Sequence, residues 1–392
     1  MRIAFVYDAL YPWVKGGAER RFHELGRRLA AAHDVHYLSW QWWEGDATVR
    51  RDGMTFHGVG RAPALYGGDG KRTVSEAVAF SARLLPTLLK HRFDVIDCSA
   101  TPYLPLYPTA FAARMTGARL VATWHEFWGE HWGEYLPHRP VVALTARTLE
   151  AGARRLGDRV VVVSGFTARV MDMESDPRVA IVPNGVDVEA IRRAAPPGDA
   201  SDLLFIGRLI DEKRVDLLLD ALAALATRHP SLRCTIIGDG PERSALERRS
   251  VALAIDDRLR FLGEVPSEEL AGHLRASRIL VLPSVREGYG MTVAEGQAAG
   301  AVPVVVRAPF SAASDLVRDG VDGILVEPTV ESVADGIASL LTDERRLKRM
   351  AAAARLAGRS RDWASSAEQA AAVYEELVRT DTVVPERKVR WS

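Results

Sequence analysis

The sequence has little that would tie the protein to a membrane, to nucleic acid or to an oxidising compartment. Its two cysteines, Cys98 and Cys234, each fall in a strand-like run, which indicates buried thiols under reducing conditions. No apolar run approaches the ~20 residues of a membrane-spanning helix. The 51 basic and 51 acidic residues cancel, so charge gives no reason to expect a nucleic-acid partner. The N-terminus passes directly into a strand-like run, so we expect no signal peptide and a cytoplasmic protein.

Strand-like and helix-like segments alternate along most of the chain. Runs such as 3–6 and 279–282 are continuously apolar, as in buried parallel strands, and helix-like stretches lie between most such runs. This alternation predicts a parallel sheet with helices wound on both faces. At 392 residues the chain is also too long for one ordinary core.

The alternation is interrupted between residues 185 and 201, where the segment 195–200 is polar and rich in proline. We therefore predict two Rossmann-like domains of the α/β class, each a doubly wound parallel sheet, facing across a cleft. They occupy residues 1–190 and 191–362. Residues 381–392 are polar, and we expect a flexible tail there.

One strand-to-helix junction carries the features of a phosphate site. The apolar run 279–282 is followed by Gly288 and Gly290 and then by a helix-like segment, Met291 to Ala299. Unpaired N–H groups and the helix dipole favour a phosphate at such a helix N-terminus. The carboxylates of Glu287 and Glu295 can accept from the vicinal hydroxyls of a ribose or a sugar. Ordinary strand-to-helix turns also contain glycines, so this stretch alone does not decide the function.

Two cations lie in the corresponding place after another predicted strand. Arg208 follows the strand-like run 203–206, and Lys213 precedes the next helix. Ligands of open α/β sheets bind outside the carboxyl ends of the strands. There the Arg208 fork can hold a phosphate through two hydrogen bonds, while Lys213 acts as a point charge. The alternative for an isolated pair of this kind is two ordinary surface cations.

Five stretches, in this order, make the chain resemble the retaining, nucleotide-sugar-dependent glycosyltransferases of family 4, which have the GT-B fold. The matching stretches are Gly16-Gly17-Ala18-Glu19, Val182-Pro183-Asn184-Gly185-Val186-Asp187, Ile206-Gly207-Arg208 with Lys213, Gly238-Asp239-Gly240-Pro241-Glu242, and Glu287 to Glu295. Tyr289 stands where the family more commonly has phenylalanine. The resemblance covers nearly the whole chain.

The resemblance implies a set of site residues. Arg208 and Lys213 would neutralise the donor diphosphate, Glu295 would hold the nucleotide ribose, and Glu287 would contact the transferred sugar. His125 would lie near the sugar and the acceptor. The full donor-binding set implied is Gly16, Gly17, Arg208, Lys213, Glu287, Gly288, Tyr289, Gly290, Met291, Thr292 and Glu295, and the catalytic set is Glu287, His125, Arg208 and Lys213. The helix at about 363–380 would pack back on the first domain.

Two further features of the first domain have alternative interpretations. Aromatic residues gather at 40–43 and at 124–135, and we favour a wall for the acceptor over a filled core. The first helix carries Arg20, Arg21, Arg27 and Arg28, and a solvated face is favoured over peripheral contact with a membrane.

Taken together, these features predict transfer of a sugar, with retention, from a nucleoside-diphosphate sugar to a hydroxyl or amine of a glycan, lipid or small-molecule acceptor. The chain contains no Asp-x-Asp, and cations plus a helix dipole can replace a metal, so we expect no metal and no other cofactor. Two alternatives stay open: a nucleotide-sugar 2-epimerase of the same fold, and a non-catalytic homologue that binds sugar nucleotides.

Overall fold

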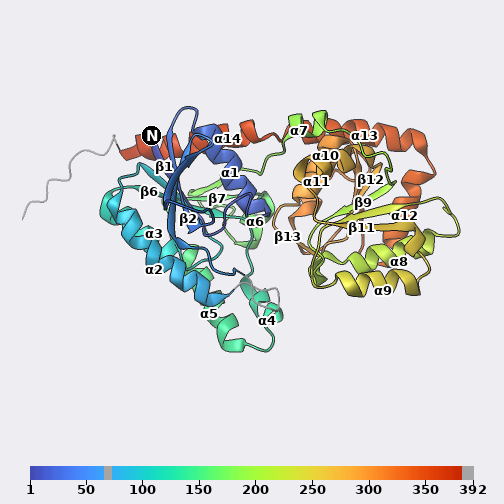
Figure 1. Cartoon of the computed structure of the whole chain (residues 1–392), viewed down its shortest axis with the longest axis horizontal. Helices are drawn as coiled ribbons and strands as arrows, with labels where there is room; N and C mark the ends of the chain where they lie inside the picture. The colour runs from blue at the N-terminus through green and yellow to red at the C-terminus, as the bar shows by residue number, and fades with distance from the viewer. Residues whose placement is uncertain (66–72, 382–392) are drawn as a thin grey trace, which may run out of the picture. The chain divides into compact units, whose positions relative to one another are not determined.

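The computed structural model describes residues 1–65 and 73–381 and divides into two compact units (Figure 1). Unit 1 contains Met1–Pro183 and Ala364–Ser392, and unit 2 contains Asn184–Trp363. Almost all of the tail predicted at 381–392 lies outside the described residues. None of the described helices is both long enough and apolar enough to cross a membrane.

Unit 1 is built on an eight-stranded sheet in the order β3-β4-β2-β1-β5-β6-β7-β8. Its strands are β1 (Arg2–Val6), β2 (Asp34–Gln41), β3 (Thr48–Arg51), β4 (Met54–Arg61), β5 (Val95–Ser99), β6 (Arg119–Trp124), β7 (Arg159–Val162) and β8 (Val179–Ile181). Its helices are α1 (Gly17–Leu29), α2 (Val74–Lys90), α3 (Leu106–Thr116), α4 (Trp132–Tyr135), α5 (Pro140–Ala153), α6 (Gly165–Val170) and α14 (Trp363–Asp381). Tyr374 of α14 donates a hydrogen bond of 2.5 Å to Asp97 of β5, which ties the C-terminal helix to this sheet.

Strand β3 is absent from the sequence prediction. It pairs antiparallel with β4, whereas every other pair in this sheet is parallel. The two strands are joined by Asp52 and Gly53, both with positive φ (52° and 79°), as a two-residue hairpin turn of the primed type requires. The Asp-Gly pair was therefore a local signal for this hairpin.

Unit 2 is built on a six-stranded parallel sheet in the order β11-β10-β9-β12-β14-β16. Its strands are β9 (Leu203–Ile206), β10 (Cys234–Ile237), β11 (Leu259–Gly263), β12 (Ile279–Leu282), β14 (Val302–Val306) and β16 (Ile324–Val326), with a small pair β13 (Arg286–Glu287) and β15 (Phe310–Ser311) beside them. Its helices are α7 (Val188–Arg193), α8 (Val215–Leu225), α9 (Arg243–Ala252), α10 (Ser267–Ala276), α11 (Met291–Ala299), α12 (Val330–Leu341) and α13 (Glu344–Arg359). The predicted α/β class with a parallel sheet in each of two domains is confirmed.

Strand order places a switch point in each sheet. In unit 2 the chain runs outward from β9 to β10 and β11 on one side, then returns to start the other side with β12. In unit 1 the same reversal falls between β1 and β5. Ligands of open α/β sheets bind at the carboxyl ends of the strands beside such a reversal. Arg208 and Lys213 follow β9, and Glu287 and Gly290 follow β12, so the predicted groups of unit 2 flank its switch point.

Three histidines pack together near one edge of the unit 1 sheet. The His36 Nδ1 and His57 Nε2 atoms are 2.8 Å apart, and the rings of His57 and His91 lie 4.8 Å apart between centroids. Burial, and then the neighbouring His36, lower the pKa of His57 from 6.5 to about 4. The folded protein therefore holds His57 neutral at a pH where the unfolded chain takes up a proton.

We expect this histidine to make unit 1 less stable in mild acid. A group whose folded pKa is depressed costs stability as pH falls from its unfolded pKa, 6.5, towards its folded pKa, about 4. The loss should be about 2 kcal/mol, given ~1.4 kcal/mol per pKa unit and partial solvent screening. Urea unfolding at pH 7 and pH 5 should show a smaller difference for His57→Gln than for the parent protein. Burial raises the pKa of Asp97 to about 6, so Asp97 stabilises the fold as pH falls, equally in the parent and in His57→Gln. If the two proteins lose the same stability between pH 7 and pH 5, the assignment to His57 is wrong.

Candidate functional site

The loops that follow β9 and β12 are joined by an ion pair. Lys213 Nζ lies 2.5 Å from Glu287 Oε1, and both side chains are mostly buried, 18% and 13% exposed. A backbone hydrogen bond of 3.0 Å from Val285 N to Glu212 O links the same two loops. The structure thus brings together two of the predicted site residues that are 74 positions apart in the sequence.

Arg208 stands at the end of β9 as an exposed side chain on a fixed backbone. Next to it, Leu209 is fully buried and its N–H donates to Asp239 O at 2.9 Å. Within the described part of the chain the Arg208 guanidinium makes no hydrogen bond or ion pair, whereas nearby Arg214 forms a two-point pair with Asp216. Arg208 is therefore a guanidinium whose donors are all available to an anion.

Glycines keep the neighbouring loop close to this one. At Gly238 (φ 127°) an added Cβ would lie 2.0 Å from Gly207 O, and at Gly240 it would lie 2.3 Å from Leu209 O. The loop after β10 therefore packs backbone against backbone on the loop that carries Arg208. Packing accounts for the glycines of the stretch Gly238-Asp239-Gly240.

The N-terminus of α11 is open at the same edge of the sheet. Gly290 is its N-cap in the left-handed region (φ 95°), and no side chain of the described residues caps this helix. An added Cβ on Gly290 would also come within 2.8 Å of Ala313 Cβ. Met291 and Thr292 follow as the first half-buried helical residues, and Glu295 on the next turn is 5% exposed. Backbone N–H groups of this first turn can receive an anion.

Tyr289 has a structural contact that its sequence position did not suggest. Its side chain is 6% exposed, and its hydroxyl donates to Asn184 O at 3.0 Å. At Gly185 an added Cβ would lie 2.5 Å from the backbone of Trp363. The stretch around Asn184 and Gly185 is thus held by Tyr289, in the loop before α11, on one side and by Trp363, at the start of α14, on the other. Half-buried Gly288 completes the predicted set in this loop.

In unit 1, His125 follows β6 and has no hydrogen-bond partner within the described residues. Both of its ring nitrogens are buried, and the rings of Phe22 and Tyr7 lie 5.6 and 6.4 Å away. Burial, with a smaller contribution from the positive charge of Arg21, lowers the pKa of His125 to about 3. At neutral pH it is a neutral imidazole with one unused donor and one unused acceptor, which suits a hydroxyl group.

The solvated face predicted for the first helix is wrong for Arg21. Its side chain is 1% exposed and donates to Pro183 O at 3.0 Å, because it lies on the side of α1 that packs against the sheet. Arg27 and Arg28 instead pair with Glu24 at the end of the helix.

Two buried carboxylates near this helix have no role in the sequence prediction, although Glu19 belongs to one of the matching stretches. Asp8 and Glu19 are 1% and 5% exposed, and the Tyr7 hydroxyl donates to Glu19 at 3.1 Å. At Gly16 an added Cβ would lie 2.3 Å from a Glu19 carboxylate oxygen, so glycine there leaves room for Glu19. The position of Asp8 two residues after the end of β1 was a usable signal, since strand ends at the switch point carry function.

The aromatic residues of unit 1 divide into core and partly exposed groups. Trp40 and Trp124 lie in strands and are 2% and 0% exposed, so for these two the predicted acceptor wall is wrong, and they fill the core. Trp128 is half-buried and packs on Trp132 and Tyr135, with ring centroids 5.3 and 4.4 Å apart.

A single buried carboxylate, Glu150 of α5, holds this aromatic group. It accepts hydrogen bonds from the backbone N–H groups of Trp128 and Gly129 at 2.8 and 2.7 Å, from the Trp132 indole at 3.2 Å, and from the Tyr103 hydroxyl. Burial raises the pKa of this carboxyl. No motif marked Glu150 in the sequence, because its donors come from residues brought together only by the fold.

Known proteins match the chain over both units. The family model "Glycosyltransferase Family 4" matches residues 15–190, and "Glycosyl transferases group 1" matches residues 187–357. A D-inositol 3-phosphate glycosyltransferase of Geodermatophilus obscurus is 34% identical over 253 residues, which are 59% of this chain and 55% of that protein. One from Corynebacterium efficiens is 31% identical over 278 residues, 62% of this chain and 65% of that protein. The chain thus spans well under two thirds of the first of these relatives and slightly under two thirds of the second.

Solved structures resemble the whole chain. Sucrose-phosphate synthase from Thermosynechococcus elongatus superimposes with a TM-score of 0.81 at 18% identity, covering 97% of this chain and 99% of that one. HepE of Anabaena, solved in complex with UDP and glucose, gives a TM-score of 0.71 at 19% identity, covering 98% of this chain and all of that one.

Two doubly wound parallel sheets, in two units that match such structures from end to end, define the GT-B fold. The two family models match the two halves of the chain in succession. The protein belongs to the family 4, or group 1, glycosyltransferases.

Proposed function

We propose that the protein transfers a sugar from a nucleoside-diphosphate sugar to a hydroxyl or amine of an acceptor, with retention at the anomeric carbon. The observation that carries the proposal is the set of groups beside the switch point of unit 2. Among the described residues, Arg208 has no partner for its donors and the N-terminus of α11 has no side-chain cap. These two groups and Lys213 lie at the same edge of one sheet. These are the groups that bind and stabilise a diphosphate.

The chemical difficulty of the reaction is the charge on the departing diphosphate. The bond between the anomeric carbon and the diphosphate oxygen breaks, and its electron pair leaves with the diphosphate. Arg208, Lys213 and the first turn of α11 would stabilise this growing negative charge. A new bond forms to the acceptor oxygen or nitrogen on the same face, and the acceptor proton passes to the departing phosphate oxygen. The carbon becomes cationic in the transition state, and Glu287 would stabilise it as a nearby anion.

The remaining predicted residues would position the substrates. The unused donor and acceptor of His125 suit a hydroxyl of the transferred sugar. Its low pKa makes it a hydrogen-bonding group and not a proton carrier at neutral pH. The assignment of Glu295 to the ribose, and of Gly16 and Gly17 to the diphosphate, stays a prediction.

The test is a screen for donor, acceptor and product. We expect one of the UDP-, GDP-, ADP- and dTDP-sugars to raise the melting temperature, because a ligand that binds only the folded state stabilises it. UDP-glucose is the first donor to test, since HepE was solved with UDP and glucose. Inositol phosphates are the first acceptors to test, since two relatives are D-inositol 3-phosphate glycosyltransferases. Product should form with the anomeric configuration of the donor retained. Conversion of the donor without an acceptor would instead favour an epimerase, and binding without conversion would favour a non-catalytic homologue.

Transfer is further proposed to need no metal. The phosphate groups would be neutralised by side chains and a helix terminus, so EDTA should leave the rate unchanged. Loss of activity in EDTA with recovery in magnesium would overturn this point alone, and would leave the transfer reaction standing.

A further inference from the structure

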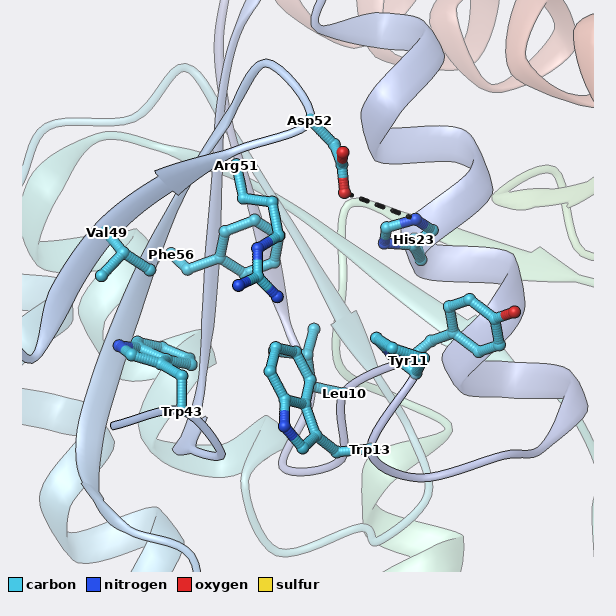
Figure 2. Close-up of a pocket in the computed structure, with 10 residues that line it drawn as sticks. Leu10, Tyr11, Trp13, His23, Trp43, Val49, Arg51, Asp52 and Phe56 are labelled. Atoms are coloured by element: carbon cyan, nitrogen blue, oxygen red, sulfur yellow. Dashed lines mark ion pairs between the residues drawn. The ribbon is translucent and has the colours of Figure 1, made fainter. Parts of the chain in front are cut away.

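The pocket beside the β3–β4 hairpin of unit 1 is too small for a substrate. The rings of Trp13 and Trp43 and the side chain of Arg51 crowd it (Figure 2). Its volume is about 20 Å³, which is room for a water molecule. An arrangement with a consequence for the proposed reaction lies instead in unit 2, where the chain enters this unit and later leaves it.

Two segments of unit 2 pair with each other at these points of entry and exit. They are residues 184–186 and 361–363, which we call the crossing pair. Val186 N donates to Arg361 O at 2.7 Å, and Val186 and Asp362 form a parallel bridge. Both passages of the chain between the units therefore adjoin this pair.

The second segment of the crossing pair is firmly fixed within unit 2. The Arg361 guanidinium donates to Gln297 Oε1 at 2.6 Å and to Leu316 O at 3.3 Å. Gln297 lies on α11 and is fully buried, as is Trp363 at the end of the segment. We therefore expect the crossing pair to open by displacement of its first segment.

That first segment is held by the loop that precedes α11. The Tyr289 hydroxyl donates to Asn184 O at 3.0 Å, and the two residues are 6% and 3% exposed. In the same loop Glu287 pairs with Lys213, and Gly290 is the N-cap of α11. Displacing the first segment must therefore either break this buried hydrogen bond or displace the loop as well.

We propose that Tyr289 is a positioning residue that makes the crossing pair respond to the bound donor. This role rests on the proposed function, because it needs a nucleoside diphosphate at the first turn of α11. When the crossing pair opens, the hydroxyl of Tyr289 displaces the loop from that turn. A nucleoside diphosphate that binds only the ordered loop would therefore oppose the opening. A tyrosine that only filled space would give no such response.

The Val186 N–H reports opening of the crossing pair, because it donates to Arg361 O. In the free protein we expect Tyr289→Phe to speed hydrogen exchange of this amide about fivefold, the scale of one lost hydrogen bond. Phenylalanine keeps the ring, so the fold should be retained. Tyr107→Phe is the matched control, since it removes a hydroxyl that donates to Leu149 O at 2.7 Å in unit 1. It should leave exchange at Val186 unchanged.

Added nucleotide tests whether the crossing pair responds to the donor site. UDP, GDP, ADP and dTDP are each tested by calorimetry, and the one that binds is added at about ten times its Kd for each protein. Exchange at Val186 should then slow about tenfold in the parent and stay unchanged in Tyr289→Phe. Ala294, whose N–H donates to Gly290 O in the first turn of α11, should be protected in both proteins.

The outcomes separate this proposal from the transfer reaction. Equal exchange at Val186 in the free parent and free Tyr289→Phe would overturn the proposal. Equal slowing in both by nucleotide, or no slowing in the parent while Ala294 is protected, would overturn it too. If no nucleotide protects Ala294 in the parent, the donor site itself is overturned, and the comparison of the free proteins alone decides whether Tyr289 controls the crossing pair.

Discussion

Replacing Arg208 with alanine is expected to lower kcat about 10²–10³-fold, the usual cost of removing one donor that stabilises charge in a transition state. The guanidinium is exposed at the end of β9 and makes no hydrogen bond or ion pair within the described residues. The side chain therefore makes no interaction within the described residues that would stabilise the fold. The free energy of unfolding should accordingly change by less than about 0.5 kcal/mol, as for other surface substitutions.

Turnover and urea unfolding of the same preparation test both halves of this expectation. Arg248→Ala is the matched control, because Arg248 is an exposed arginine of α9 in the same unit and belongs to none of the site loops. It should leave both quantities at the parent values. A rate for Arg208→Ala close to the parent rate would show that Arg208 does not contribute to catalysis. A large loss of stability would mean that the lower rate comes from unfolded protein.

The fold could be predicted from the sequence because its signals are local. Each buried parallel strand is a short apolar run, and each crossover helix separates two such runs, so alternation alone indicates a doubly wound sheet. Strand β3 was not predicted because Thr48–Arg51 is short, polar and largely exposed. The Asp52-Gly53 turn was its only local signal. A short edge strand has no buried face to leave an apolar pattern.

The site was less predictable, because its contacts depend on strand order. Lys213 and Glu287 meet only since β9 and β12 are neighbours in the sheet, and alternation along the chain does not specify which strands pair. The burial of Arg21 and the four donors of Glu150 likewise arise from packing between elements. Residue types and positions at strand ends indicated the chemistry, and the pairing of the groups required the structure.

The Lys213–Glu287 pair leads to the second large effect, in Glu287→Gln. In the free protein Glu287 neutralises Lys213 at 2.5 Å, so a diphosphate must compete with a carboxylate for that ammonium. Glutamine keeps the shape and removes the charge. We expect nucleoside diphosphate to bind at least about three- to fivefold more tightly, because even an exposed ion pair contributes up to ~1 kcal/mol and this one is mostly buried. Turnover should fall about a hundredfold, because the anion near the cationic anomeric carbon is lost.

Calorimetry with the nucleoside diphosphate and steady-state kinetics measure the two effects separately. Asp216→Asn is the control, since it breaks the neighbouring pair with Arg214 and should change neither quantity. Adding Lys213→Met to Glu287→Gln should abolish the gain in affinity if that gain comes from the freed ammonium. Equal losses of affinity and turnover in Glu287→Gln would instead assign Glu287 to ground-state binding. Glu287 would then weaken binding of the donor and yet speed the transfer. The two effects can differ in sign because only interactions that strengthen in the transition state raise kcat.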